Sequence, residues 1–156
     1  MKIILAEASD APLIHDMMIK AFMEYKDEIP PSSALEETVQ TISTALDDGE
    51  KALISYIGDE PVGMVRFRLK DNGVYFYRLS VIPEKQGQGI AKEILKSLDD
   101  YAKQYEKPTI ICKVRMTVPK NIKLYSSIGY RIYDEEVVHK PNGIIMKVVS
   151  MKKQLL

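Results

Sequence analysis

The sequence predicts a mixed α/β fold, in which one central sheet of about seven mostly antiparallel strands carries helices on both faces. Hydrophobic residues recur at helical spacing in four segments and form short strand-like runs in seven others. Turn residues separate the later strands, at residues 58–61, 71–73 and 141–143. No repeat, low-complexity tract or internal linker interrupts the 156 residues, so we expect a single domain over residues 1–156.

The chain begins with one strand and two helices. Residues 2–8 are a short apolar run typical of a strand, and Ser9 and Asp10 then open a helix that continues to Tyr25. Pro30 and Pro31 follow this helix. Residues 33–36, Ser-Ala-Leu-Glu, match a capping box, which predicts that the second helix begins there. Its apolar positions fall on one face: Leu35, Val39, Ile42 and Leu46.

Strands and helices alternate in the rest of the chain. Three antiparallel strands are expected first, and their ranges are 52–57, 62–70 and 74–81. A long amphipathic helix over 90–105 and a β-branched strand over 109–114 come next. A short helix over 119–128 ends at Gly129, and two final strands cover 130–138 and 144–149.

Composition restricts the partners of the chain. Its 22 basic and 22 acidic residues cancel, so it lacks the field expected of a protein that binds nucleic acid or an anionic membrane. Cys112 is the one cysteine, which excludes an internal disulfide, and with two histidines it builds no zinc site, so we expect no metal. The first residues reach Glu7 too soon for a secretory signal, and we expect a cytoplasmic protein.

Residues 81–91 join the third of the antiparallel strands to the long helix through two glycines. Gly87 and Gly89 have no Cβ, so their backbone can approach a ligand closely and turn its N–H groups toward an anion at the start of a helix. Phosphate is the expected guest. A dinucleotide motif would need glycine where Lys92 stands, and the Gly-Lys-Ser/Thr of a P-loop does not occur near this turn, which excludes both motifs.

Two segments carry a resemblance to a known family. Residues 86–91, Gln-Gly-Gln-Gly-Ile-Ala, follow a strand that ends in Val-x-Pro-Glu, and they resemble the signature of the GNAT family of acyl-CoA-dependent N-acetyltransferases. Residues 121–130 resemble the fourth-helix segment of that family, in which Leu-Tyr-x-x-x-Gly-Phe/Tyr ends a helix and begins a strand. The order of elements is also the family's order. The resemblance covers essentially the whole chain and is sharpest over residues 78–130.

The resemblance implies acetyl-CoA as the co-substrate and a role for each residue of the turn. Its pyrophosphate would bind the amides of the turn, which belong to Gln86, Gly87, Gln88, Gly89, Ile90 and Ala91. Backbone groups of Leu79 and Val81 would pair with pantetheine, and an N–H near Val81 would polarise the thioester carbonyl. Tyr125 would be the general acid for the leaving thiolate. Val118 stands where many relatives have an asparagine, and either Asn121 substitutes for it or the contact is absent.

The general base is not identified by the sequence. Relatives often carry a glutamate about six residues before Val-x-Pro, where this chain has Val-Tyr-Phe-Tyr at residues 74–77. Either Glu24 or Glu28 reaches the amine through water, or the amine arrives partly neutral. Alternatively, Glu24, Asp27 and Glu28 belong to a solvated acidic loop without a catalytic role. As a group they weakly favour a cationic amine, and Tyr75 and Arg78 are further candidates for acceptor contacts.

A basic stripe on the second antiparallel strand has two interpretations. Met64, Arg66, Arg68 and Lys70 alternate with apolar residues and share one face. The stripe is either a solvated strand face or, together with Arg78 of the next strand, a contact for a carboxylate of the acceptor.

These features predict an N-acetyltransferase that moves the acetyl group from acetyl-CoA directly to a primary amine of a small molecule or a peptide. No nucleic acid or membrane partner is expected, and a homodimer is left open. Two alternatives remain. A protein or peptide N-terminal acetyltransferase would need an open acceptor groove. A non-catalytic CoA-binding module is suggested by the missing strand carboxylate and by Val118.

Overall fold

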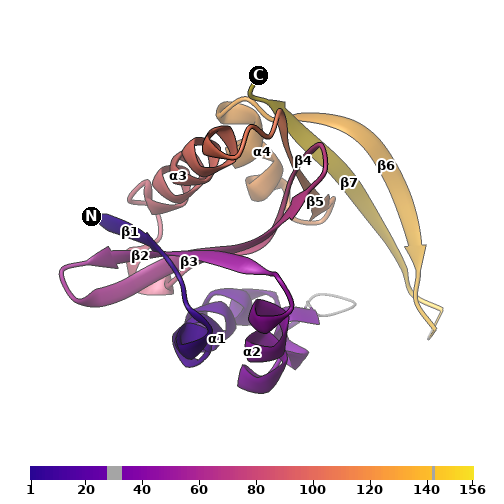
Figure 1. The fold of residues 1–156 in the computed structure, drawn as a ribbon. Helices are drawn as coiled ribbons and strands as arrows, with labels where there is room; N and C mark the ends of the chain where they lie inside the picture. The colour runs from indigo at the N-terminus through magenta and orange to yellow at the C-terminus, as the bar shows by residue number, and fades with distance from the viewer. Residues whose placement is uncertain (28–32, 142) are drawn as a thin grey trace. The chain divides into compact units, whose positions relative to one another are not determined.

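A computed structural model describes residues 1–27, 33–141 and 143–156, and Figure 1 shows the fold. Its helices are α1 (Ala11–Phe22), α2 (Val39–Asp47), α3 (Ile90–Gln104) and α4 (Pro119–Ser127). Its strands are β1 (Lys2–Leu5), β2 (Lys51–Ile57), β3 (Glu60–Lys70), β4 (Gly73–Val81), β5 (Thr109–Arg115), β6 (Arg131–His139) and β7 (Ile145–Gln154). The predicted turn residue Asn142 and the predicted helix-ending Pro30 and Pro31 lie outside the described residues.

The strands form one mixed sheet in the order β1-β2-β3-β4-β5-β7-β6. β4 and β5 are parallel, whereas β1–β2, β2–β3, β5–β7 and β6–β7 are antiparallel pairs. This confirms the predicted α/β class with its mostly antiparallel sheet. The chain divides into two compact units, one of residues 1–69 and 76–98 and one of residues 70–75 and 99–156. A single domain over residues 1–156 stays a prediction.

In the first unit, helices cover both faces of the strands. Figure 1 shows α1 and α2 against one face of β1 to β3 and the beginning of α3 against the other. Gly63 allows that close approach, because a Cβ there would lie 2.9 Å from Ile94 Cδ1 and 2.9 Å from the carbonyl oxygen of Ser80. The middle of β3, residues 62–67, is therefore buried on both sides, and even its polar Arg66 is only 3% exposed.

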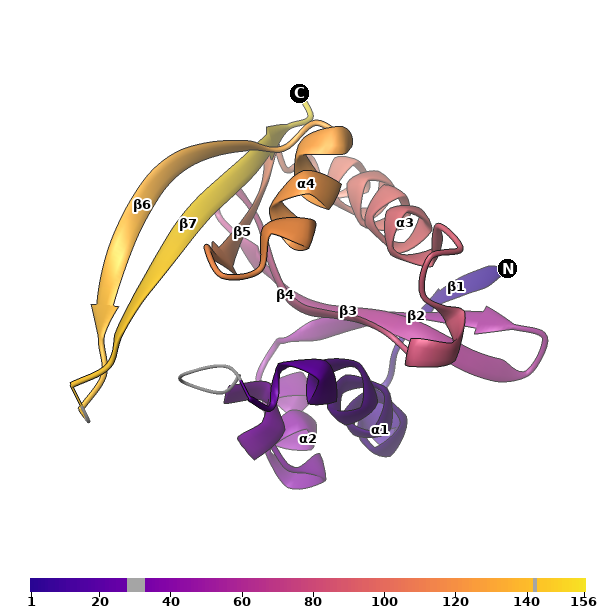
Figure 2. The same cartoon turned by 180° about the vertical axis from the view of Figure 1, so that it is seen from behind.

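In the second unit, α4 packs beside β5 (Figure 2). In the sheet, β7 lies next to β5, and β6 lies next to β7 at the edge. The core includes Ile110 and Cys112 of β5 together with Val149 and Met151 of β7. Gly73 is required where β4 begins, since a Cβ there would approach the carbonyl oxygen of Thr109 to 2.8 Å. The absence of a side chain at Gly73 thus lets β4 approach the start of β5 closely.

Several predicted boundaries are wrong: β1 ends at Leu5 rather than at residue 8, α1 ends at Phe22 rather than at Tyr25, and β7 continues to Gln154 rather than ending at residue 149. The difference that concerns the site is the start of α2. Residues 33–36 form a short 3-10 turn, and α2 begins only at Val39, with Thr38 as its N-cap. The side chain of Thr38 accepts from the backbone N–H of Thr41 at 3.1 Å, while the Thr41 hydroxyl accepts from the N–H of Thr38 at 2.9 Å. This capping box, rather than the one predicted at Ser33, starts the helix and leaves Glu37 in the break.

Within the described ranges, the helices are all too short or too polar to cross a membrane.

Candidate active site

The turn between β4 and α3 has the geometry that glycine alone adopts easily. Gly87 and Gly89 lie at φ +80 and φ +81, in the left-handed region that side chains disfavour. A Cβ built on either glycine would meet nothing within 4 Å. The backbone conformation therefore requires these glycines, and the space beside them is open to a ligand.

The amides at the start of α3 precede its hydrogen-bond ladder. Glu93 N–H donates to the Gly89 carbonyl at 3.1 Å, so the N–H groups of Ile90, Ala91 and Lys92 come before the first of these bonds. Together with the helix dipole, such amides attract an anion. Binding of a pyrophosphate at this turn stays a prediction, and the backbone N–H of Gln86, one of the amides predicted to contribute, already donates to the Pro83 carbonyl at 3.3 Å.

The last residues of β4 are fixed on both sides. The Gln86 side chain donates from Nε2 to the Val81 carbonyl at 3.1 Å, and Ile82 N–H donates to Val62 of β3 at 3.0 Å. Val81 is buried, whereas Leu79 is half-buried. The residue before them, Arg78, has φ 57, which is unusual for a residue with a side chain.

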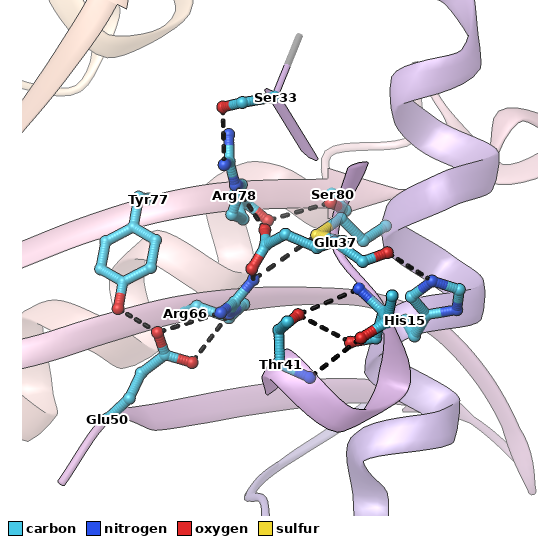
Figure 3. A network of polar contacts seen from close by, with 11 residues as sticks. His15, Ser33, Glu37, Thr41, Glu50, Arg66, Tyr77, Arg78 and Ser80 are labelled. Carbon is cyan, nitrogen blue, oxygen red and sulfur yellow. Dashed lines mark hydrogen bonds and ion pairs between the residues drawn. The ribbon is translucent and has the colours of Figure 1, made fainter. Parts of the chain in front are cut away.

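Arg66 is at the centre of a buried polar network, shown in Figure 3. Its Nε donates to Glu50 Oε2 at 2.8 Å and its Nη2 to Glu50 Oε1 at 3.1 Å. Its Nη1 donates to both Glu37 oxygens, at 2.9 and 2.8 Å. The solvated-face interpretation is therefore wrong for Arg66, because its side chain is 3% exposed. Its carboxylate partners, Glu37 and Glu50, belong to the protein itself. Burial lowers the pKa of Arg66, but hydrogen bonding and attraction to Glu50 and then Glu37 outweigh it, so that pKa is raised overall.

Glu37 and Tyr77 extend this network to β4. Arg78 Nε donates to Glu37 Oε2 at 2.9 Å, and the Tyr77 hydroxyl donates to Glu50 Oε1 (Figure 3). Burial, followed by the hydrogen bond to Glu50, raises the pKa of Tyr77 above its usual range. Two carboxylates and two guanidinium groups thus balance in charge.

The sequence reasoning missed both acids of this network. The available signal was Arg66 itself, an arginine between the apolar Val65 and Phe67 on a strand, since a buried arginine requires acidic partners. A buried arginine implies that acidic partners exist, but it does not identify which residues they are. Glu37 and Glu50 lie 29 and 16 residues from Arg66 in the sequence.

In the second unit, α4 carries Tyr125, the predicted general acid, and Asn121, the predicted pantetheine contact. Tyr125 is 6% exposed, and its ring centroid lies 5.8 Å from that of Tyr130. Tyr130 N–H donates to the Tyr125 carbonyl at 3.0 Å. Asn121 is half-buried one helical turn earlier, so it shares a face with Tyr125, and Val118 precedes the helix as its N-cap.

The remaining predicted acceptor residues are spread over the chain. Glu24 lies in the short turn Met23–Tyr25 and is exposed, as is Asp27, while Glu28 lies outside the described residues. Tyr75 pairs with Ile111 in the second unit. In the part of the chain that the structure describes, His, Cys, Asp and Glu side chains form no group of three suited to a metal ion.

Known proteins match this chain in sequence pattern and in fold. The family model described as the acetyltransferase (GNAT) family matches residues 14–130. No curated protein sequence matches the chain.

Solved structures match its fold over nearly the full length. The ribosomal-protein-S18-alanine N-acetyltransferase of Escherichia coli aligns with a TM-score of 0.80 and 16% identity, over 99% of this chain and 93% of that one. A probable acetyltransferase of Staphylococcus epidermidis gives 0.83 and 14%, over 99% of each chain. A GNAT acetyltransferase of Elizabethkingia anophelis with acetyl-CoA bound gives 0.73 and 19%, over 99% and 97%.

Proposed function

Because the chain belongs to the GNAT family of acetyltransferases, which confirms the resemblance seen in its sequence, we propose that it acetylates a primary amine of a small molecule or a peptide directly. It is an acetyl-CoA-dependent acetyltransferase, and acetyl-CoA supplies the acetyl group as an activated thioester. The primary amine as acceptor is our proposal, and the following residues support the donor side of the reaction, namely the binding of acetyl-CoA and the departure of its thiolate.

The glycine turn is the observation that carries the proposal. Gly87 and Gly89 hold a left-handed backbone with open space beside them, and the first amides of α3 follow directly. Those amides would hold the pyrophosphate, while the backbone of Leu79 and Val81 would hold pantetheine and polarise the thioester carbonyl. The turn and the strand end belong to the same unit, so their mutual arrangement is part of the described geometry.

Tyr125 would donate the proton that the departing thiolate needs. Its ring is buried against Tyr130, which restricts the direction of its hydroxyl. Many relatives have an asparagine where this chain has Val118. Asn121, on the same face of α4 as Tyr125, would make the contact with the pantetheine arm instead.

The acidic residues of the polar network do not supply the base. Every carboxylate oxygen of Glu37 and Glu50 already accepts at least one hydrogen bond from Arg66, Arg78 or Tyr77. Protonation of either acid would break bonds inside the fold. The amine would therefore lose its proton to water, and the carboxylate of Glu24 or Glu28 would assist as a base through that water.

A thiol-release assay over a panel of amines tests the function. The panel contains polyamines, lysine-like amines, amino acids, dicarboxylate amines and short peptides, and release without amine is subtracted. Amine-dependent release by the first two groups supports the proposal and its preference for cations. Preference for peptides with a free N-terminus would favour the N-terminal acetyltransferase, and CoA binding without any amine-dependent release would leave a non-catalytic module.

A further inference from the structure

We propose that Glu37 is a positioning residue that holds Arg78 in its left-handed conformation and so fixes the course of β4 immediately before Leu79 and Val81. The inference rests on the proposed function, because that strand end is where the thioester is expected. It gives Glu37, which lies in the break before α2, an indirect role in the reaction.

The conformation of Arg78 is costly and has a visible consequence. Arg78 and Glu106 are the non-glycine residues with positive φ in the described chain, and φ 57 at Arg78 falls inside a strand. Neighbouring residues of a regular strand point to opposite faces. Tyr77 and Arg78 nevertheless both reach the network, Tyr77 through Glu50 and Arg78 through Glu37 (Figure 3). Arg78 therefore interrupts the regular alternation of β4, and this interruption decides which face of the strand each later residue points to.

Three hydrogen bonds hold the residue there. Arg78 Nε donates to Glu37 Oε2 at 2.9 Å, Arg78 Nη2 to Ser33 Oγ at 3.0 Å, and the Ser80 hydroxyl to the Arg78 carbonyl at 2.9 Å. The ion pair to Glu37 is the strong member. The side chains of Arg78 and Glu37 are 25% and 20% exposed, so water screens this pair less than one at the open surface.

Glu37 is itself held from several directions. Its carboxylate accepts from the buried Arg66, which Glu50 holds in turn. Its carbonyl oxygen lies 2.9 Å from His15 Nε2 on α1, and its N–H donates to the Ala34 carbonyl at 3.2 Å. A carboxylate fixed in this way can oppose backbone strain in its partner, which a mobile surface acid cannot do.

Loss of the Glu37 charge would let Arg78 return to an extended conformation. Beyond it, Ile82 stays bonded to Val62, so the change would be absorbed at Leu79 and Ser80. The amides expected beside the thioester would rotate, while the glycine turn would keep its geometry. Turnover should therefore fall more than affinity for CoA.

A double-mutant cycle tests this, because glycine adopts positive φ without help. Glu37→Gln should lower kcat on the order of tenfold, the usual preference of a residue with a side chain against this conformation, with KM for acetyl-CoA changed less. In the Arg78→Gly background the same Glu37→Gln change should alter kcat by less than about twofold. An equal loss of kcat in both backgrounds, or no loss in either, would overturn the inference.

Further variants separate positioning from general stability. Glu36→Gln makes the same chemical change at the exposed neighbouring residue and should leave kcat unaltered. Glu37→Gln should lower Tm in both backgrounds, since Arg66 loses a partner in each, so Tm and kcat should not follow one another. If Glu37→Gln does not fold, Glu37→Asp keeps the charge but withdraws the oxygens, and it should show the same dependence on the background.

A readout without activity distinguishes failure of this inference from failure of the proposed function. The three-bond coupling between the amide and α protons of Arg78 reports its φ by NMR. A shift toward the extended value in Glu37→Gln supports the positioning role even if no amine is ever acetylated. An unchanged coupling refutes it even if the wild-type protein is an active amine acetyltransferase.

Discussion

Gly89→Ala should separate the ligand-binding role of the turn from its role in folding. The new Cβ would meet nothing within 4 Å in the protein, so no steric clash is created. The cost to the fold is the strain of alanine at φ +81, about 1–2 kcal/mol, or a fall in Tm of roughly 3–6 °C. The methyl group occupies the space expected for pyrophosphate, and losing one or two charge-assisted bonds would weaken CoA binding about 10- to 100-fold.

Isothermal titration calorimetry with CoA measures this affinity, and Gly143→Ala is the matched control. Gly143 lies at φ +85 in the turn before β7, and a Cβ there also meets nothing within 4 Å. The control should lose similar thermal stability and keep its affinity for CoA. A folded Gly89→Ala protein with wild-type affinity would refute the pyrophosphate assignment, and equal weakening by both variants would attribute the effect to strain.

Three further predictions follow from the site and its surroundings. Tyr125→Phe should keep the fold and CoA affinity but lower kcat about 100-fold. If a thiol-release assay gives the wild-type kcat for this variant, Tyr125 has only a packing role. Arg66→Met should destabilise the protein by about 3–5 kcal/mol in urea unfolding, because Glu50 is left buried, whereas Arg68→Met should cost less than about 1 kcal/mol. Burial raises the pKa of Cys112 from 9.0 to about 12 and leaves the side chain 2% exposed, so at pH 8 a disulfide reagent should label the native thiol much more slowly than the unfolded one. Because the unfolded thiol ionises first, this group should also lower stability as pH rises from 9.0 toward 12, and the slope of Tm against pH should flatten in Cys112→Ala.

The sequence was sufficient wherever the backbone has few alternatives. Two glycines one residue apart before an amphipathic helix predicted the turn, and the positive φ of Gly87 and Gly89 is the reason that other residues do not serve there. The same holds for the short helix that ends at Gly129, whose φ of +103 is again unfavourable to side chains. Local stereochemistry decides these features, so a local pattern can predict them.

The polar network could not be predicted, because distant contacts decide it. From the sequence, the Ser-Ala-Leu-Glu pattern at residues 33–36 predicts the start of the second helix, whereas the helix begins after Thr38. The choice of Thr38 leaves Glu37 outside the helix, where it accepts from Arg66 and Arg78, which lie 29 and 41 residues away. Likewise, the alternating pattern around Arg66 resembles a solvated strand, but helices on both faces of β3 bury it. Propensity and spacing carry no information about such partners.

The charge balance of the network bears on how the enzyme would handle the proton of its substrate. Glu37 and Glu50 are the acids of the described network, and all four of their carboxylate oxygens accept hydrogen bonds. Tyr77, which stands near the place where relatives often carry a glutamate, uses its hydroxyl to complete this arrangement. All the carboxylates and the tyrosine hydroxyl of the network are thus engaged in hydrogen bonds within it, and no group of the network is left to act as a base. We therefore expect kcat/KM to rise with pH according to the pKa of each acceptor amine, rather than according to one ionisation shared by all substrates.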